Sequence, residues 1–332
     1  MIRLGFIRWH KSITLMAMLA LGSMILPAQA QTYPTKTINM IVPFAAGGPT
    51  DTLGRNLALA MSKILKQQVT IENVGGAGGN IGVARVAKAS ADGYTLLLHH
   101  IGMATSPALY RTLSYNPLGD FEYIGLVSDV PMTLIARGDF PPASFKELVP
   151  YLKANRAKVS LANAGLGAAS HLCGLIFLSS IEVDLVTVPY KGTAPAMNDL
   201  LGGQVDIMCD QTTNTTGQIL GKKVKAYGVS TRTRVASLPD IPTLDEQGLK
   251  GFDVAIWHGV YAPKGTPKAA TERLVSALQS ALLDPDLKAN LAKLGTEPVE
   301  QKRATPAALE AHLKAEIAKW APVIKKAGQY AD

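Results

Sequence analysis

The organisation of this chain starts from Ile38-Asn39-Met40-Ile41-Val42-Pro43-Phe44-Ala45-Ala46-Gly47-Gly48-Pro49-Thr50-Asp51, where an apolar strand leads through a glycine-rich turn into an amphipathic helix. Gly47 and Gly48 permit a tight turn, and Thr50 and Asp51 are suitable N-caps for the helix. The N–H groups at a helix start have no intrahelical partner and carry the positive end of the helix dipole, so they favour a carboxylate or a phosphate. A strand-to-helix turn that binds nothing is the alternative, and this stretch alone leaves both interpretations open.

Strands and helices continue to alternate after this stretch. We expect strands at residues 38–42, 69–72 and 94–98, with one helix to about residue 64 and another over residues 80–88. This alternation predicts a parallel sheet with helices on both faces. Because ligands bind at the carboxyl ends of the strands in such sheets, we expect the loops after these three strands to share one edge.

A second series of alternating elements follows an irregular connection, and it also begins with a strand that enters a glycine-rich helix start. The pattern predicts strands at residues 159–162, 183–188, 205–209, 224–229 and 254–261. It predicts helices that start near residue 144, that run from the glycine-rich turn through residue 178, and that run from the turn at residues 190–192 to residue 201, followed by helices at residues 268–282, 284–294 and 306–327. We expect the C-terminal helices to return to the first unit. The second unit is then an insertion joined to the first by two crossing strands.

The first thirty residues have the features of a secretory signal peptide. Arg3, Arg8 and Lys11 form a basic leader, residues 13–26 are apolar, and Ala28-Gln29-Ala30 provides a small-residue cleavage site. The rest of the sequence has no uninterrupted apolar stretch of about twenty residues, and no cysteine lies near the cleavage site to carry a lipid. We therefore expect cleavage after the last of these alanines and a soluble, exported protein in the periplasm.

The charge of the chain is mildly positive. Cleavage would remove three basic residues and lower the formal net charge from +8 to +5. The remaining basic residues are scattered rather than gathered into a stripe with aromatic residues. The composition therefore disfavours nucleic-acid binding and suits an anionic small molecule.

Two cysteines, Cys173 and Cys209, lie in an expected apolar helix and an expected apolar strand. Export permits a disulfide, but free buried cysteine is common in segments of this kind. We favour two free thiols and leave their pairing open.

The glycine-rich segment Gly75 to Gly82 lies between a strand and a helix and has the spacing of a dinucleotide fingerprint. The next strand ends in Leu98-His99-His100 instead of the acidic residue that would hold a ribose. An exported protein also has little access to nicotinamide cofactors. We interpret the segment as a loop at the edge of the sheet, with Asn80 as a helix cap, and expect no cofactor.

The turn from Asn163 to His171 repeats the arrangement of the first turn, with glycines for close approach and Ser170 at the start of a helix. Two such turns that face each other could hold both ends of a small dicarboxylate, or one carboxylate from two sides. His171 is a candidate ligand contact, although we favour a structural role for its ring.

Further polar residues end other strands. Tyr190 and Lys191 would add a ring, a hydroxyl and positive charge to the same edge, with solvated turn residues as the alternative. An ionised Asp210 would repel a carboxylate, so we expect it to orient a water or a neighbouring donor. His99 and His100 are adjacent on a strand and should point to opposite sides, which disfavours metal binding by the pair and leaves open which ring faces the cleft.

The sequence contains no G-x-S-x-G nucleophile elbow, no H-E-x-x-H motif, no paired-cysteine motif and no P-loop. The absence of these motifs lowers the expectation of an enzyme without excluding one.

Several motifs in a fixed order resemble those of the periplasmic receptors of the tripartite tricarboxylate transporter system, the Bug family. They are Tyr33-Pro34, Val42 to Asp51, Gly78-Gly79-Asn80-Ile81-Gly82, Val188-Pro189-Tyr190-Lys191-Gly192, Leu200 to Asp206, and Leu238 to Leu244. Together they cover essentially the whole mature chain.

The resemblance implies an α/β fold with two lobes, a type II periplasmic binding protein or Venus flytrap, in which each lobe is a sheet flanked by helices. Applied to this chain, residues 1–30 are the signal peptide, residues 31–130 and 251–332 form lobe 1, and residues 131–250 form the inserted lobe 2. The lobes would close on the ligand through a hinge in the crossing strands.

The resemblance also implies a carboxylate held by backbone amides and hydroxyls of two facing helix-start loops, here Ala45 to Asp51 and Gly165 to His171. The predicted ligand-binding residues are Phe44, Ala46, Gly47, Gly48, Thr50, Asp51, Asn80, His100, Gly165, Gly167, Ala169, Ser170, His171, Tyr190, Lys191 and Asp210. We predict no catalytic residue, no metal and no cofactor.

The preferred hypothesis is a monomeric extracytoplasmic receptor that captures an organic carboxylate and delivers it, without chemistry, to the membrane permease subunits of a tripartite tricarboxylate transporter. The carboxylate could be an aliphatic di- or tricarboxylate or an aromatic acid, and the sequence leaves this open. One alternative is a carboxylate sensor that partners a membrane kinase. Another is an exported hydrolase that uses Ser170 and His171, although neighbouring helix side chains diverge by about 100 degrees.

Overall fold

The computed structural model describes residues 33–327. The predicted signal peptide, Met1 to Ala30, lies outside the described residues. The strands are β1 (Ile38–Val42), β2 (Val69–Asn73), β3 (Thr95–His100), β4 (Phe121–Arg137), β5 (Ser160–Asn163), β6 (Val186–Pro189), β7 (Ile207–Gln211), β8 (Val224–Val229) and β9 (Ala255–Pro263). The helices are α2 (Pro49–Leu65), α3 (Asn80–Ala87), α4 (Gly102–Leu109), α5 (Phe145–Ala154), α6 (Ala169–Ile181), α7 (Thr193–Leu201), α8 (Thr212–Leu220), α9 (Lys268–Ala281), α10 (Pro285–Lys293) and α11 (Pro306–Ala327), with 3-10 turns η1 (Ala77–Gly79) and η2 (Gln301–Arg303).

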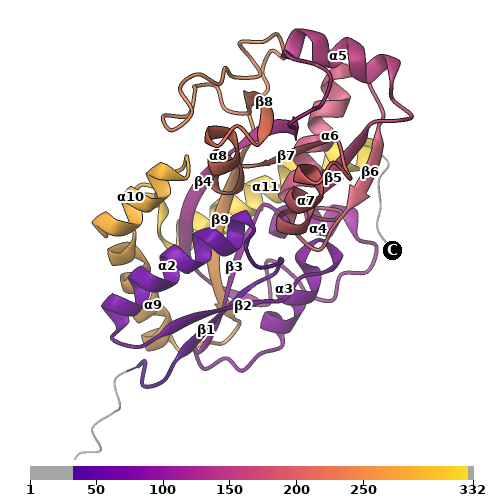
Figure 1. Cartoon of the computed structure of the whole chain (residues 1–332). Helices are drawn as coiled ribbons and strands as arrows, with labels where there is room; N and C mark the ends of the chain where they lie inside the picture. Colours follow the sequence, from indigo (N-terminus) through magenta and orange to yellow (C-terminus); the bar gives the residue numbers. More distant parts are fainter. Residues whose placement is uncertain (1–32, 328–332) are drawn as a thin grey trace, which may run out of the picture. The chain divides into compact units, whose positions relative to one another are not determined.

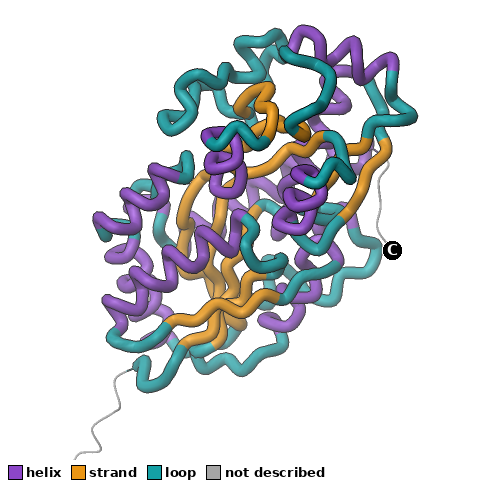
Figure 2. Tube along the Cα trace, viewed as in Figure 1, coloured by secondary structure: helices purple, strands orange, loops and turns teal. Residues whose placement is uncertain are grey.

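The first series of elements forms a parallel set of strands in the order β2-β1-β3. Ile38 pairs with Val69 and Asn39 with Thr95, so the carboxyl ends of the three strands meet at one edge as the sequence predicts. Strand β1 is mostly apolar because both of its faces are covered, and four of its five residues are buried, whereas in the edge strand β2 only Val69 is buried. Figure 2 shows helices on both sides of the strands.

The second series forms another parallel set, with β5 paired to β6 on one side and to β7 on the other. The expectation of parallel strands is thus correct within each series. It is wrong for the strands that join the two series, because β4 and β9 run antiparallel to each other and to their other neighbours.

Strand β4 changes partners along its length of 17 residues. Phe121 to Pro131 pair with β9, whereas Met132 to Arg137 pair with β7 and β8. The order β2-β1-β3-β9-β4-β7-β5-β6 therefore runs through both parallel sets, and β4 and β9 are the crossing strands (Figure 1). The sheet consists of two parallel portions joined in the middle by antiparallel strands.

The C-terminal helices pack on the first parallel set and the elements near it. Helices α9 and α10 contact α2, and α11 contacts α4 and β4. Leu53, Leu57 and Met61 of α2 are fully buried, as the 3.6-residue spacing of apolar residues predicts. Within residues 33–327, none of the helices combines the length and the apolar character of a membrane span.

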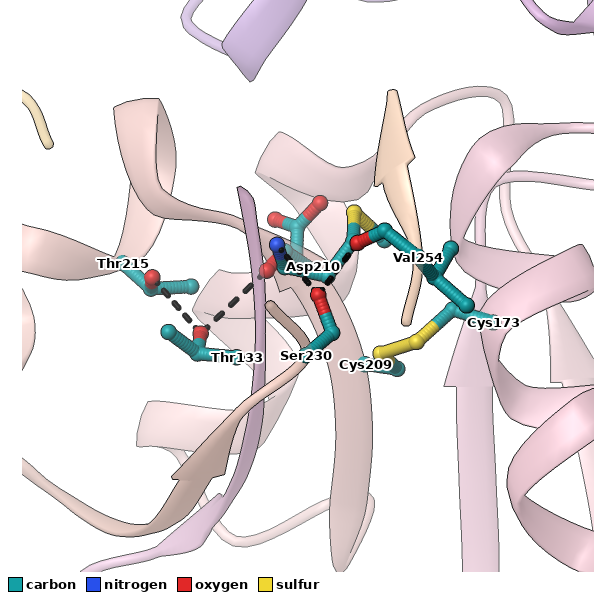
Figure 3. Close-up of a disulfide and its surroundings, with 8 residues drawn as sticks. Thr133, Cys173, Cys209, Asp210, Thr215, Ser230 and Val254 are labelled. Carbon is teal, nitrogen blue, oxygen red and sulfur yellow. Dashed lines mark hydrogen bonds between the residues drawn. A yellow bond between two sulfur atoms is a disulfide. The ribbon is translucent and has the colours of Figure 1, made fainter. Parts of the chain in front are cut away.

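The sequence-based predictions missed two helices and were wrong about the cysteines. Helices α4 and α8 were not predicted, because α4 contains Pro107 and α8 reads Thr-Thr-Asn-Thr-Thr-Gly, a run of poor helix formers. Cys173 and Cys209 form a disulfide with 5.9 Å between their Cα atoms, so the preference for free thiols was wrong. The disulfide connects α6 to β7 (Figure 3).

Candidate functional site

The starts of four helices surround one small cavity. Its lining residues come from the first turns of α2, α6 and α7, from the residues just before α8, and from the loops beside them: Phe44, Pro49, Thr50, His100, Ala164, Ala169, Ser170, Thr193, Asp210 and Gln211. The cavity leaves about 10 Å³ for the centre of a water molecule, which is room for about one water. Each helix start points N–H groups and the positive end of a dipole toward this region.

The turn before α2 is held by a buried carboxylate. The N-cap is Gly48 and Pro49 is the first helical residue, so the prediction of Thr50 and Asp51 as caps was wrong. Asp51 lies in the first helical turn and accepts hydrogen bonds from the Gly47 N–H (2.8 Å), from Asn73 Nδ2 (2.9 Å) and from Arg55 Nε (2.9 Å). This network fixes the backbone of the turn.

These bonds occupy the carboxylate of Asp51. Burial acts to raise the pKa of Asp51, but the hydrogen bonds from Arg55, the Gly47 N–H and Asn73 outweigh burial and lower it. The side chain therefore stays ionised and committed to the turn. Asp51 does not line the cavity.

The turn before α6 is held in the same way by its own side chains. Ser170 Oγ accepts from the Ala164 N–H (2.8 Å), and His171 Nδ1 accepts from the Gly167 N–H (3.3 Å). Gly165 and Gly167 have φ values of +100° and +80°, which glycine adopts without strain. The ring of His171 holds this turn through its bond with Gly167 and does not line the cavity, whereas Ser170 does.

Two further helix starts reach the cavity, and their residues Thr193 and Gln211 were not among the predicted site residues, although a helix after Gly192 was itself predicted. Thr193 is the first residue of α7, after Gly192 with a φ of +152°, and Gln211 is the N-cap of α8. The Gly-Thr-Ala-Pro sequence at the start of α7 has Pro in its first turn, which is a helix-start signal. The start of α8 carries no comparable signal beyond its threonines.

Several cavity-lining oxygen atoms have no partner. Thr193 Oγ1, Asp210 Oδ1 and Gln211 Oε1 are buried and make no hydrogen bond within the described part of the chain. The other oxygen of Asp210, Oδ2, accepts from Asn214 Nδ2 (2.6 Å). Burial raises the pKa of Asp210 to about 6, although Asn214, the Gln211 N–H and the nearby Thr193 hydroxyl act to lower it.

Three histidine rings lie next to the cavity. The rings of His99 and His100 are 4.7 Å apart and both lie against Phe44, so the expectation that they point to opposite sides was wrong. Only the His100 ring lines the cavity. His258 of β9 lies beside His100 and is 3.3 Å from Thr50 Oγ1. Burial lowers the pKa of all three rings, to about 3 for His99 and about 4 for His258.

Direct contacts join the two parallel portions of the structure around the cavity. The Ala45 N–H donates to the Lys191 carbonyl (3.1 Å), Thr105 Oγ1 donates to the Gly167 carbonyl (2.8 Å), and Tyr110 Oη donates to the Leu166 carbonyl (3.0 Å). These bonds bring together the loops on either side of the cavity, although none of the six residues lines it. Beside it lies an open groove of about 650 Å³.

The predicted site residues fall into three groups. Six line the cavity: Phe44, Thr50, His100, Ala169, Ser170 and Asp210. Three line the neighbouring groove: Gly165, Tyr190 and Lys191. Seven line neither, namely Ala46, Gly47, Gly48, Asp51, Asn80, Gly167 and His171.

Two residues outside the cavity make other contacts. The hydroxyl of Tyr190 donates to Asp199 (2.6 Å), and Asn80 Oδ1 accepts from the Tyr115 hydroxyl (2.6 Å). Asn80 is the first residue of α3 and Gly79 its N-cap, so the predicted capping role was wrong.

The cavity combines helix starts with one acidic side chain, Asp210, among the described residues that line it. Among the described residues that line it there is no lysine or arginine, and positive potential comes from the helix starts. No group of three or more histidine, cysteine, aspartate or glutamate side chains in residues 33–327 could hold a metal ion.

Residues 53–329 match the protein family described as "Tripartite tricarboxylate transporter family receptor". The structure is similar to that of the periplasmic binding protein BugD, with a TM-score of 0.88 and 56% sequence identity over 90% of this chain and 100% of the other. These similarities agree with the two-lobed periplasmic binding protein fold.

Two more distant structures contain ligands. MatC from Rhodopseudomonas palustris, with bound malate, is 38% identical, with a TM-score of 0.85 over 88% of this chain and 100% of the other. A second R. palustris protein, with adipate, is 33% identical, with a TM-score of 0.84 over 89% of this chain and 98% of the other.

Proposed function

This chain belongs to the tripartite tricarboxylate transporter family receptors, and we propose that it captures an organic carboxylate in the cavity between its lobes and delivers it to a membrane permease. The observation that carries the proposal is the convergence of four helix starts on one cavity. A carboxylate placed there would meet N–H donors and the positive ends of four dipoles. The malate and adipate of the two related structures are carboxylates as well.

Binding would require the lobes to move. A cavity with room for about one water is smaller than any di- or tricarboxylate. The ligand would enter an open form, with the hinge in β4 and β9, and the closed form that holds it would have a larger cavity than the one in this structure. Residues 31–130 and 251–332 would form one lobe and residues 131–250 the other, since β4 changes partners between Pro131 and Met132.

The proposed role involves no chemical change to the ligand. The hydroxyl of Ser170 and the ring of His171 are the candidates for a nucleophile and a base, but each holds the turn before α6 through a backbone N–H. Delivery to permease subunits, action as a monomer and residence in the periplasm after signal-peptide cleavage complete the proposal. The family description names a transporter receptor.

The test is thermal unfolding of the secreted, mature protein against aliphatic di- and tricarboxylates, amino acids and aromatic carboxylates. A ligand at about one hundred times its Kd should add roughly 2.7 kcal/mol to the free energy of unfolding, which is several degrees in Tm. We expect a shift for one class of carboxylate and recovery of that compound unchanged. No shift with any carboxylate, or consumption of the compound, would contradict the proposal.

A further inference from the structure

The cavity presents acceptor atoms as well as donors. Thr193 Oγ1, Asp210 Oδ1 and Gln211 Oε1 lack partners, and their residues are only 4%, 1% and 2% exposed. A buried polar atom without a hydrogen bond costs on the order of 1–3 kcal/mol. Three such atoms in the lining of one cavity mark a position for a donor group that comes from outside the chain.

We propose that Thr193, Asp210 and Gln211 bind a hydrogen-bond donor that the ligand carries next to its carboxylate, so that the receptor selects α-hydroxy or α-amino carboxylates over the unsubstituted acids. This inference rests on the proposed function and names the class of carboxylate. Both types of ligand carry a hydrogen-bond donor next to a carboxylate. In the first type the donor is a hydroxyl, and in the second it is an ammonium group.

The position of the three residues explains why the donor must be close to the carboxylate. Thr193 begins α7 and Gln211 caps α8, so the acceptor side chains stand at the same helix starts whose N–H groups suit the carboxylate. The small cavity keeps the two kinds of group near each other. A ligand that satisfies both needs its donor within a bond or two of its carboxylate carbon.

The charge of the cavity favours the same class. Asp210 is the only carboxylate in the lining, and neither lysine nor arginine stands among those described residues. A pKa of about 6 leaves Asp210 largely ionised at neutral pH. A second carboxylate at this position would be repelled, whereas an ammonium would be attracted and a hydroxyl would donate without added charge.

The backbone that carries Asp210 is fixed. Cys209, the preceding residue, is bonded to Cys173 of α6, and Thr133 Oγ1 donates to the Asp210 carbonyl (3.2 Å). Figure 3 shows these groups around the start of the Asp210 side chain. Asn214 holds the second carboxylate oxygen, so the unpartnered Oδ1 has a defined place in the cavity lining.

The experiment compares acids that differ only in the donor. Calorimetric Kd values are measured for the mature protein with propionate, lactate and alanine, with succinate, malate and aspartate, with glutarate, 2-hydroxyglutarate and glutamate, and with phenylacetate, mandelate and phenylglycine. In the trio that fits the cavity, we expect the hydroxy or amino acid to bind at least tenfold more tightly than the unsubstituted acid. The order of the hydroxy and the amino acid identifies which donor is used.

Substitutions test whether the acceptor side chains cause the preference for the substituted acids. Asp210→Asn should reduce the preference for the substituted acid to threefold or less, while the matched control Asp184→Asn, at an exposed carboxylate, should keep it. Because Asp210 is buried and its replacement could impair folding, Thr193→Val provides a second test. It removes a hydroxyl that makes no hydrogen bond within the described residues, although it lies near enough to Asp210 to lower the pKa of that carboxyl. Folding should be little affected while the preference falls severalfold.

The outcomes separate this inference from the proposed function. Binding of unsubstituted acids as tight as that of their hydroxy and amino counterparts overturns the inference and leaves carboxylate binding intact. Equal weakening of all three members of a trio by Asp210→Asn and Thr193→Val overturns it too. Absence of binding by every carboxylate overturns the proposed function itself.

Discussion

The three histidines beside the cavity are packed as uncharged rings. His99 and His258 are 0% exposed and His100 is 2% exposed, and neither ring nitrogen of His99 has a partner in residues 33–327. Such rings contribute to packing against Phe44 only while they are neutral. Their protonation is therefore linked to unfolding.

We expect the protein to lose stability as the pH falls below about 6.5. The unfolded chain takes up protons near the ordinary histidine pKa, whereas burial keeps the folded pKa of His99 at about 3 and of His258 at about 4. The unfolded state thus binds more protons between these values, and each ring costs on the order of 2 kcal/mol by pH 4.5. Asp210 opposes this trend, because its raised pKa adds stability as the pH falls from about 6.

The measurement is urea unfolding of the wild type and His99→Leu between pH 7.5 and 4.5. The variant loses no hydrogen bond at the ring and should show a shallower fall in the free energy of unfolding. Parallel pH profiles for the two proteins would contradict the assignment of this loss to His99.

At the scale of the elements, the sequence predicts what depends on local pattern. The bounds of β1, β8 and α11 agree with the predicted ranges, because apolar periodicity and turn residues are local signals. The antiparallel pairing of β4 with β9 joins segments far apart in the chain, and no local pattern specifies that partner. The starts of α7, which was predicted, and of α8, which was not, come together at the cavity only through the order of β5, β6 and β7.

The same limit applies to the candidate site. Phe44, Thr50 and Ser170 could be placed near the cavity because each lies between a strand and the first turn of the helix that follows a glycine-rich loop. Whether a side chain there faces a ligand or holds its own turn depends on three-dimensional contacts. Asp51 is the clearest example, since it fits the sequence pattern of an anion-binding loop but is occupied by Arg55, Asn73 and a backbone N–H.

The disulfide between α6 and β7 joins two elements that contribute to the cavity, and its removal should destabilise the protein. The cysteines are 36 residues apart, and a closed loop of this length corresponds to about 3–4 kcal/mol in the chain-entropy estimate. We expect Cys173→Ala/Cys209→Ala to lose free energy of unfolding of this order in urea. Thiol titration of the unreduced, denatured wild type should find no free thiol, and two titratable thiols would contradict the pairing.

At the scale of the whole described fold, the proposed function requires the two lobes to meet. Several glycines lie where the loops touch, and Gly78 is the closest of them. A Cβ added at Gly78 would lie 2.0 Å from the Leu166 carbonyl oxygen of the facing loop. That clash exists only when the loops are together. The added Cβ would also lie 2.9 Å from the Tyr110 hydroxyl, which is the end of a flexible side chain and can move. A side chain at this position should therefore oppose closure more than folding.

We therefore expect Gly78→Ala to weaken carboxylate binding at least tenfold, equivalent to about 1.4 kcal/mol, while the ligand-free Tm changes little more than in a matched control. Gly203→Ala is that control, because Gly203 has a φ of +72°, close to the +62° of Gly78, and its added Cβ would meet nothing within 4 Å. Both variants place an alanine at a similar positive φ and so have similar backbone strain. The difference between their Kd values in calorimetry therefore measures the effect of the contact between the loops. X-ray scattering should in addition show a ligand-dependent decrease in the radius of gyration for the wild type and Gly203→Ala, and a smaller decrease for Gly78→Ala. Equal affinity in the two variants would mean that the ligand is held without these loops meeting, and the hinge-closure mechanism would then have to be abandoned.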